Sequence, residues 1–272
     1  MRMHWTMIAG LAVVMSMPSQ AQQRTGLAAA ADAMGATTLN SIQYTGSGLV
    51  FSFGQAYEPG ERWPRFVQRV YSAAINYQTP GMRLIQVRSQ GEHPPRGGGA
   101  QAVAADQRTV QAVSGKFAWQ EGGAQAAPNP GAVDERLRQL WATPHGVIKA
   151  AMANSAHVDG NTVTFSLDGR EVKATLNAQN LVEKVSYLLT NEVVGDYPIE
   201  FAYADYADFG GVKFPRHIVQ TEDGHPTLDI TVTEVKPNAA VMVDVPANVQ
   251  QATAPPVRVA VDKLADGVWT MS

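Results

Sequence analysis

The chain has 272 residues, of which 45% are hydrophobic and 17% are charged, an ordinary composition for one large globular domain or two small ones. The formal net charge of −3, with no basic stripe that carries interleaved aromatic residues, argues against a nucleic-acid-binding protein. Because the chain contains no cysteine, a disulfide framework, a thiolate zinc site, a cysteine nucleophile and a lipid-anchored N-terminal cysteine are all excluded.

Residues 1–21 have the features of a secretory signal peptide. Arg2 precedes the apolar run Met7–Met17, and Ser19 and Ala21 are small residues suited to a cleavage site. The run is too short to span a bilayer comfortably, although an uncleaved anchor helix is the alternative. No later stretch is apolar enough for a membrane helix. We expect cleavage near Ala21 and an exported protein, periplasmic or secreted, with no integral membrane span.

The first half of the mature chain is predicted to begin with a helix and to continue with strands. Thr25 can cap a short helix over Gly26–Met34, and Gly35 can end it. Apolar residues then recur at every second position, a pattern typical of strands. The predicted strands run over residues 41–53, 65–77, 82–89 and 115–120, with a loop over residues 91–99. In the second strand, Val67 and Tyr71 are expected on the same face.

Two helices are predicted in the middle of the chain. Asn129 followed by Pro130 is a typical cap and first residue of a helix, and Thr143 followed by Pro144 repeats the signal. The second helix should run to about Asn154.

The second half of the chain returns to strands, which are predicted over residues 161–167, 171–176, 181–189, 197–206, 212–220 and 227–235. Two sets of alternating apolar residues define the dry face of the last strands: Tyr197, Ile199, Phe201 and Tyr203 in one, and Leu228, Ile230 and Val232 in the other. Gly210-Gly211 and Asp223-Gly224 are expected at the turns between strands.

These elements predict an α+β fold built on one strongly curved antiparallel sheet, a half-barrel of about ten strands. An antiparallel sheet with a long apolar face must cover that face, and the predicted helices are few and short. We therefore expect helices that fill the concave face only in part. Seven aromatic side chains are expected either to form the core or to line a cleft for an apolar ligand: Phe51, Tyr71, Phe117, Trp119, Tyr187, Phe201 and Tyr203.

The order of these elements resembles a known family. Together with the phrase Phe209–Pro215 (Phe-Gly-Gly-Val-Lys-Phe-Pro) and the run Leu228–Asn238, it is similar to the half-barrel family of periplasmic outer-membrane lipoprotein carriers, the LolA-like proteins. The resemblance covers roughly Thr25 to Asn238, within a domain expected over residues 22–249. It implies a concave apolar face that accepts acyl chains or another hydrophobic partner.

The C-terminal tail resembles a different family. After a proline-rich linker expected over residues 250–256, residues 257–272 include the phrase Lys263–Trp269 (Lys-Leu-Ala-Asp-Gly-Val-Trp), which is similar to the opening strands of a metallo-β-lactamase-fold hydrolase. Such domains continue to a His-x-His-x-Asp-His cluster that holds zinc and activates water, and this sequence contains no such cluster. The resemblance implies the N-terminal region of a longer exported hydrolase, or a truncated relative.

The chain itself lacks the residue patterns of catalytic and metal sites. No two histidines lie two or four positions apart, so no ligand pair is set on a strand or a helix. The acids around Asp205 and Asp208 lack calcium-loop spacing, and neither a Gly-x-Ser-x-Gly elbow nor a phosphate loop occurs. We therefore predict no catalytic residue, no metal ligand and no cofactor in this chain, with zinc expected only in a downstream domain.

Three functions are compatible with these features. The first is an exported, non-catalytic accessory or binding domain of such a hydrolase, which holds an apolar ligand on its concave face. The second is a periplasmic carrier or scaffold for lipid or lipoprotein. The third is a zinc-dependent hydrolase, if a catalytic domain follows Ser272. The expected partners are an apolar small molecule or acyl chain and, in a homodimer, a second copy of the chain.

Overall fold

The computed structural model of the chain describes residues 20–92, 103, 105–191, 195–252 and 259–271. Nearly all of the predicted signal peptide therefore lies outside the described residues, as do most of the loop expected over residues 91–99 and most of the linker expected over residues 250–256. No helix in the described ranges is long and apolar enough to cross a membrane.

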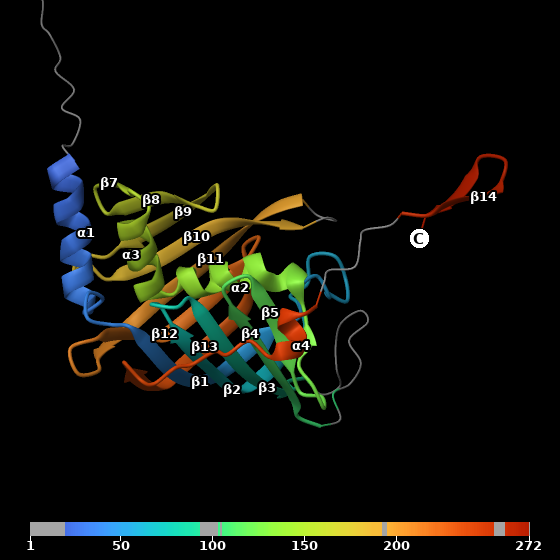
Figure 1. Cartoon of the computed structure of the whole chain (residues 1–272), viewed down its shortest axis with the longest axis horizontal. Helices are drawn as coiled ribbons and strands as arrows, with labels where there is room; N and C mark the ends of the chain where they lie inside the picture. Colours follow the sequence, from blue (N-terminus) through green and yellow to red (C-terminus); the bar gives the residue numbers. More distant parts are fainter. Residues whose placement is uncertain (1–19, 93–102, 104, 192–194, 253–258, 272) are drawn as a thin grey trace, which may run out of the picture.

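Most of the described chain belongs to one open antiparallel sheet of thirteen strands (Figure 1). Its order is β6-β5-β4-β3-β2-β1-β13-β12-β11-β10-β9-β8-β7, so two meanders are joined where β1 pairs with β13. The first meander holds β1 (Ser41–Phe51), β2 (Arg65–Asn76), β3 (Gly81–Gln90), β4 (Gln107–Ser114), β5 (Phe117–Glu121) and β6 (Ala127–Pro128). The second holds β7 (His157–Asp159), β8 (Thr162–Leu167), β9 (Arg170–Leu176), β10 (Val182–Asn191), β11 (Gly195–Asp208), β12 (Lys213–Glu222) and β13 (His225–Pro237).

The predicted number of about ten strands is too low, because the sequence did not reveal β4, β6 and β7. Strands β6 and β7 have only 2 and 3 residues, too few for a two-residue period to be visible. Strand β4 buries only small apolar side chains, and two of them, Ala112 and Val113, are adjacent, which breaks the alternation. The other ten strands lie where the alternation predicts them, with ends that differ by a few residues.

Within the described ranges, four α-helices and one 3-10 helix accompany the sheet: α1 (Gln20–Met34), η1 (Pro130–Ala132), α2 (Val133–Ala142), α3 (Pro144–Ala153) and α4 (Ala247–Gln250). Helix α1 begins six residues before the predicted Gly26, so Thr25 lies inside the helix and not at the predicted N-terminus. Three of the six residues from Gln20 to Thr25 are glutamine and one is alanine, and both residue types extend a helix readily. The predicted end is right, because Gly35 adopts a φ of 68° and Ala36 N–H donates to the Ala31 carbonyl at 2.8 Å.

The two middle helices start where the sequence predicts, but without the expected side-chain caps. Neither Asn129 nor Thr143 makes a capping hydrogen bond. The Thr143 hydroxyl donates backward to the Leu140 carbonyl at 2.7 Å and lies 2.9 Å from the Tyr77 hydroxyl. Because Thr143 is buried in the junction between α2 and α3, its side chain serves that junction and not the first turn of α3.

The concave face of the sheet carries the main core, with α2 lying across the open side between β10 and β11 and the strands β4 and β5 (Figure 1). The expected dry face of the last strands is confirmed, because Ile199, Phe201 and Tyr203 are buried, as are Leu228, Ile230 and Val232. The helices contribute Leu140, Val147 and Ile148, all fully buried against this face. Each of these larger side chains contributes roughly 1.5–3 kcal/mol by leaving water.

A β-bulge overturns one predicted face. Val67 was expected beside Tyr71 on the dry face of β2, but it is 37% exposed whereas Tyr71 is buried. The pairing of β2 with β3 shifts register between Gln68 and Val70, which adds one residue to β2. Since one extra residue reverses the parity of a strand, Val67 and Tyr71 fall on opposite faces. The bulge is held by Gln68, whose Nε2 donates to the Val70 carbonyl at 2.6 Å.

The C-terminal part of the described chain contributes two further elements. Residues 239–252 run along the ends of the first meander, where Ser41 Oγ donates to the Ala239 carbonyl at 2.6 Å and Asn76 Nδ2 to the Val241 carbonyl at 3.0 Å. Strands β14 (Val261–Ala265) and β15 (Val268–Met271) then form a separate two-stranded hairpin. The hairpin pairs with no other strand in the described ranges.

His145 on α3 is a fully buried titratable group in the core. Its Nε2 donates to the Met34 carbonyl at the end of α1 at 3.1 Å, and its ring stacks on Phe214 with centroids 5.9 Å apart. Burial lowers the pKa of His145 from 6.5 to about 4, because the charged imidazolium would lose its hydration. His145 is therefore a neutral core residue that joins α1, α3 and β12.

Because the pKa of His145 is lower in the folded protein than in the unfolded chain, we expect the protein to be less stable in mildly acidic solution. The unfolded state binds more protons between pH 6.5 and about 4, so the free energy of unfolding falls as the pH falls through this window. The loss should reach roughly 3 kcal/mol. Urea denaturation at pH 7 and pH 4.5 measures it. The variant His145→Gln keeps a hydrogen-bond donor for the Met34 carbonyl but has no titrating side chain. If this variant loses as much stability between pH 7 and pH 4.5 as the unmodified protein, His145 is not the cause of the loss.

Candidate functional site

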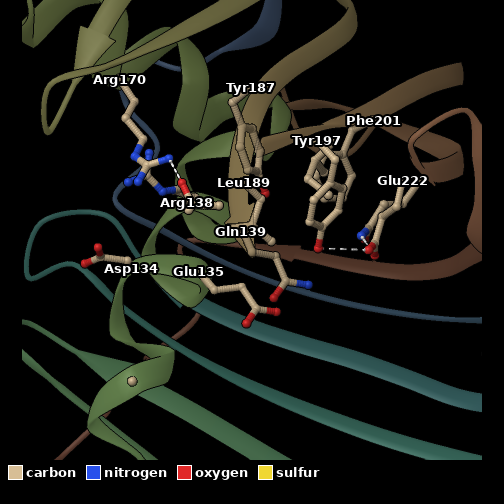
Figure 2. Close-up of a pocket in the computed structure, with 14 residues that line it drawn as sticks. Asp134, Glu135, Arg138, Gln139, Arg170, Tyr187, Leu189, Tyr197, Phe201 and Glu222 are labelled. Atoms are coloured by element: carbon tan, nitrogen blue, oxygen red, sulfur yellow. Dashed lines mark hydrogen bonds between the residues drawn. The ribbon is translucent and has the colours of Figure 1, made fainter. Parts of the chain in front are cut away.

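A cleft of about 390 Å³ lies between α2 and the concave face of strands β10 to β12 (Figure 2). Its floor is apolar and comes from the sheet: Tyr187, Leu189, Ile199 and Phe201. Its walls and rim are polar and come from several elements: Gly131, Asp134, Glu135, Arg138, Gln139, Arg170, Thr190, Tyr197, Gln220 and Glu222. The cleft thus combines an apolar bottom with a charged rim.

The alternation of two neighbouring strands creates the floor. Tyr187 lies opposite Ile199, and Leu189 lies opposite Tyr197, in the antiparallel pairing of β10 with β11. Because residues two apart share a face, these four side chains and Phe201 all point to the concave side, Tyr197 at the rim and the others on the floor. Leu188, between them on β10, points to the outside and is 49% exposed.

Helix α2 is held in place over the sheet by hydrogen bonds from both meanders. Arg136 is buried, and its Nη1 donates to the carbonyls of Ala112 in β4 and Trp119 in β5 at 2.9 and 2.6 Å. On the other side, the Tyr203 hydroxyl of β11 donates to the Ala142 carbonyl at 2.7 Å. The helix therefore bridges the opening of the sheet, and the cleft is the space that it leaves above β10 to β12.

Four of the seven aromatic residues singled out in the sequence lie at or beside the cleft. Tyr187 and Phe201 line it. Tyr71 and Tyr203 are buried next to α2, where the Tyr71 hydroxyl accepts a hydrogen bond from Gln139 Nε2 at 3.4 Å. Gln139 itself lines the cleft, so Tyr71 positions a wall residue of the site.

The other three aromatic residues do not line the cleft. Phe117 and Trp119 pack in a second, smaller cluster with Ala112 and Val249. Their neighbour Ala118 faces the main core instead, so the two aromatic side chains occupy the opposite face of β5. Phe51 is half-buried at the end of β1. Periodicity shows that Phe117 and Trp119 share a face, but not which face of the sheet that is.

One end of the cleft is acidic. Glu222 accepts hydrogen bonds from Gln220 Nε2 at 3.0 Å and from the Tyr197 hydroxyl at 3.5 Å. Burial raises the pKa of Glu222, and the negative charge of Glu135 adds to this effect. Burial likewise raises the pKa of Tyr197, again with the charges of Glu222 and Glu135 contributing.

Two arginines lie at the other end of the cleft in the view of Figure 2. Arg170 of β9 donates a short hydrogen bond to Thr190 Oγ1 and lies 3.9 Å from Asp196. Arg138 of α2 is only 7% exposed, and its Nη1 is buried without a hydrogen-bond partner in the described ranges. Sequence reasoning missed Arg138, because an arginine four residues after Asp134 on a helix is typical of a solvent-exposed ion pair.

A second hollow, of about 410 Å³, lies on the outer side of strands β9 to β11. Its lining includes Lys173, Ser186, Leu188 and Pro198, and the last three of these belong to neighbouring positions of β10 and β11. No buried polar atom without a partner lies in it, as far as the described residues show. The concave cleft is therefore the better candidate for a binding site.

Metal chemistry finds no support in the described ranges. No group of three or more histidine, cysteine, aspartate or glutamate side chains there is placed to hold a metal ion.

Comparison with known proteins found no matching family model and no matching curated protein. Solved structures that are similar to the chain include the following three. The LolA superfamily protein NE2245 from Nitrosomonas europaea is 12% identical, over 83% of this chain and 96% of that one, with a TM-score of 0.42. The lipoprotein LppX from Mycobacterium tuberculosis is 12% identical, over 81% and 99%, with a TM-score of 0.33. LprF from Mycobacterium bovis is 14% identical, over 82% and 98%, with a TM-score of 0.32.

The first of these structures bears the name of the superfamily that residues 25–238 resemble in sequence. With identities of 12–14% and TM-scores of 0.32–0.42, however, the three likenesses establish neither membership of a family nor a ligand. The function must therefore follow from the chemistry of the cleft.

We expect Glu222 to titrate above its ordinary pKa of 4.5, since burial and the charge of Glu135 both disfavour the carboxylate. Glu135→Gln should lower the pKa of Glu222 by removing the charge, and Asp134→Asn is the matched control with a smaller effect. Carboxyl carbon shifts in NMR, followed from pH 3 to pH 8, measure both. A pKa at or below 4.5 in the unmodified protein would refute this view of the acidic end.

Proposed function

We propose that residues 22–249 form an exported binding domain whose concave cleft holds an apolar or amphiphilic small molecule. The observation that carries the proposal is a cleft with an aromatic and aliphatic floor beneath a polar rim, on the side of the sheet that α2 leaves open. Sites of this kind bury the apolar part of a ligand, while a few polar groups orient it.

The size of the cleft favours a small ligand. At about 390 Å³ it lies near the lower end of the range of roughly 300–1,000 Å³ that is usual for small-molecule sites. One single-chain molecule suits this volume better than a lipid with several acyl chains. The sequence resemblance to LolA-like carriers supports the same class of ligand, and a periplasmic carrier of lipid or lipoprotein is the finer form of the proposal.

Saturable binding of a neutral, environment-sensitive probe, N-phenyl-1-naphthylamine, is the expected result. Leu189→Asp should abolish it by placing a charge on the apolar floor. Leu188→Asp is the matched control: the neighbouring residue of β10 lies outside the cleft and is 49% exposed, so binding should persist. Fluorescence titration gives the affinity, and circular dichroism verifies folding. A folded wild-type protein without saturable binding, or equal losses in both variants, would refute the proposal.

A second candidate function rests on the hairpin β14–β15. It is separate from the large sheet and exposes several apolar side chains: Val261, Leu264, Val268, Trp269 and Met271. A two-stranded hairpin is only marginally stable alone and gains stability from further structure. We propose that this hairpin is the opening of another domain, and that residues 22–249 are an accessory domain of a zinc-dependent hydrolase, as the resemblance of residues 257–272 implies.

Two proteins distinguish this candidate from a free-standing carrier: residues 22–272, and the same reading frame extended through any downstream sequence. We expect only the extended protein to bind zinc and to hydrolyse an ester or a lactam, because the sequence of residues 22–272 contains no His-x-His-x-Asp-His motif. Metal analysis and a chromogenic substrate give the readouts. If the extended protein neither binds zinc nor hydrolyses either substrate, the hydrolase candidate is wrong. Sedimentation of the same proteins tests the predicted homodimer.

A further inference from the structure

The wall of the cleft contains a buried cation with an open donor. Arg138 is 7% exposed, and its Nη1 is buried without a hydrogen-bond partner in the described ranges, although the residue lines the cleft. A guanidinium removed from water is strongly unfavourable unless it is paired and hydrogen-bonded. Buried polar groups almost always find partners, so an exception inside a cleft indicates a partner that is not part of the chain.

The residues near Arg138 in sequence do not supply this partner. Asp134 and Glu135 lie four and three residues earlier on α2, the spacing that normally forms ion pairs on a helix surface. Both acids are exposed at the rim, however, and no ion pair within 4.0 Å joins either of them to Arg138 in the described part of the chain. Both acids line the cleft as Arg138 does, but their side chains are exposed, and in the described part of the chain neither one satisfies the buried Nη1 donor of Arg138.

Both arginines lie at the end of the cleft away from Glu222 in the view of Figure 2, where the exposed Asp134 also lies, and the exposed Glu135 lies between the two ends. Arg170 is already engaged by Thr190 and Asp196, which leaves the Arg138 guanidinium as the open donor of the pair. Glu222 lies at the other end in the view of Figure 2, hydrogen-bonded to Gln220 and Tyr197. An anion at the arginine end would therefore avoid Glu222. The apolar floor between the two ends offers contact for a hydrocarbon chain.

We infer that the ligand is a single-chain anionic amphiphile, whose carboxylate or phosphate accepts hydrogen bonds from Arg138 while its chain lies over Tyr187, Leu189 and Phe201. The planar guanidinium presents parallel N–H donors that match the oxygens of a carboxylate or a phosphate. This inference rests on the proposed binding function and adds the chemical class of the headgroup and its anchor.

Four ligands with the same chain test the headgroup: dodecanoate, dodecyl phosphate, dodecanol and dodecyltrimethylammonium. Below their micellar concentrations, we expect calorimetry to show that at least one anion binds about 10- to 100-fold more tightly than dodecanol. Arg138→Gln should remove this preference, so that the anions bind no more tightly than dodecanol. Lys173→Gln, the same charge change on the outer side of β9, is the matched control and should keep the preference. The tighter of the two anions identifies the headgroup.

The outcomes separate this inference from the function on which it rests. If dodecanol and the anions bind equally, or if Arg138→Gln keeps the preference, the inference is wrong while the binding function stands. A preference for the ammonium ligand would overturn it as well. If none of the four ligands binds, the proposed function itself fails.

Thermal melting gives a second, independent readout. Without ligand, Arg138→Met should melt at a higher temperature than the unmodified protein, because it removes a buried charge that lacks a partner. With saturating anion the order should reverse, since only the unmodified protein gains the stabilisation of a bound headgroup. An Arg138→Met variant that melts lower under both conditions would show that Arg138 is structural, and would contradict the inference.

Discussion

The structure depends on how one long apolar sheet face is covered by very few helices. In the described part of the chain, thirteen strands present this face, α2 and α3 with 10 residues each lie across it between the two meanders, and α1 covers it beside β7 and β12. Hydrogen bonds from Arg136 to β4 and β5 hold α2 towards the first meander. The space over β10 to β12 is therefore left uncovered, and the cleft is a direct consequence of where α2 is anchored.

The seam between the meanders imposes a second constraint, at Gly46 and Gly48 in β1. A Cβ atom on Gly48 would lie 2.1 Å from the Asp229 carbonyl oxygen, and one on Gly46 would lie 2.6 Å from that of Thr231. The pairing with β13 shifts register at the first of these glycines. Only glycine lets the two backbones approach so closely, and without this approach the two meanders would not share one curved face.

Sequence reasoning succeeded where local pattern and tertiary environment agree. Ile199, Phe201 and Tyr203 alternate in the sequence and are buried, and Gly35 ends α1 as its backbone freedom predicts. It failed where one inserted residue changes parity, as at Val67, and where a strand is too short to show a period. In the cleft, Tyr187 and Phe201 could be singled out as large apolar residues. The polar residues at the two ends of the cleft, Arg138 and Glu222, could not be singled out, because their environments depend on side chains that are distant in sequence.

Arg138 differs from the other buried residues of α2, because one of its donors has no partner in the described part of the chain. Every other large side chain of α2 that is buried either is apolar, as Leu140 is, or satisfies its charge with backbone carbonyls, as Arg136 does. A buried guanidinium with an open donor lowers the stability of the unliganded domain, and a hydrophobic residue of similar size would raise it. Unfavourable local features of this kind concentrate at functional sites, where a bound ligand can supply the hydrogen bond that the folded chain lacks. The same cleft that follows from the anchoring of α2 thus places one unsatisfied cation above an apolar floor, and this pairing selects an anionic amphiphile over a purely apolar ligand.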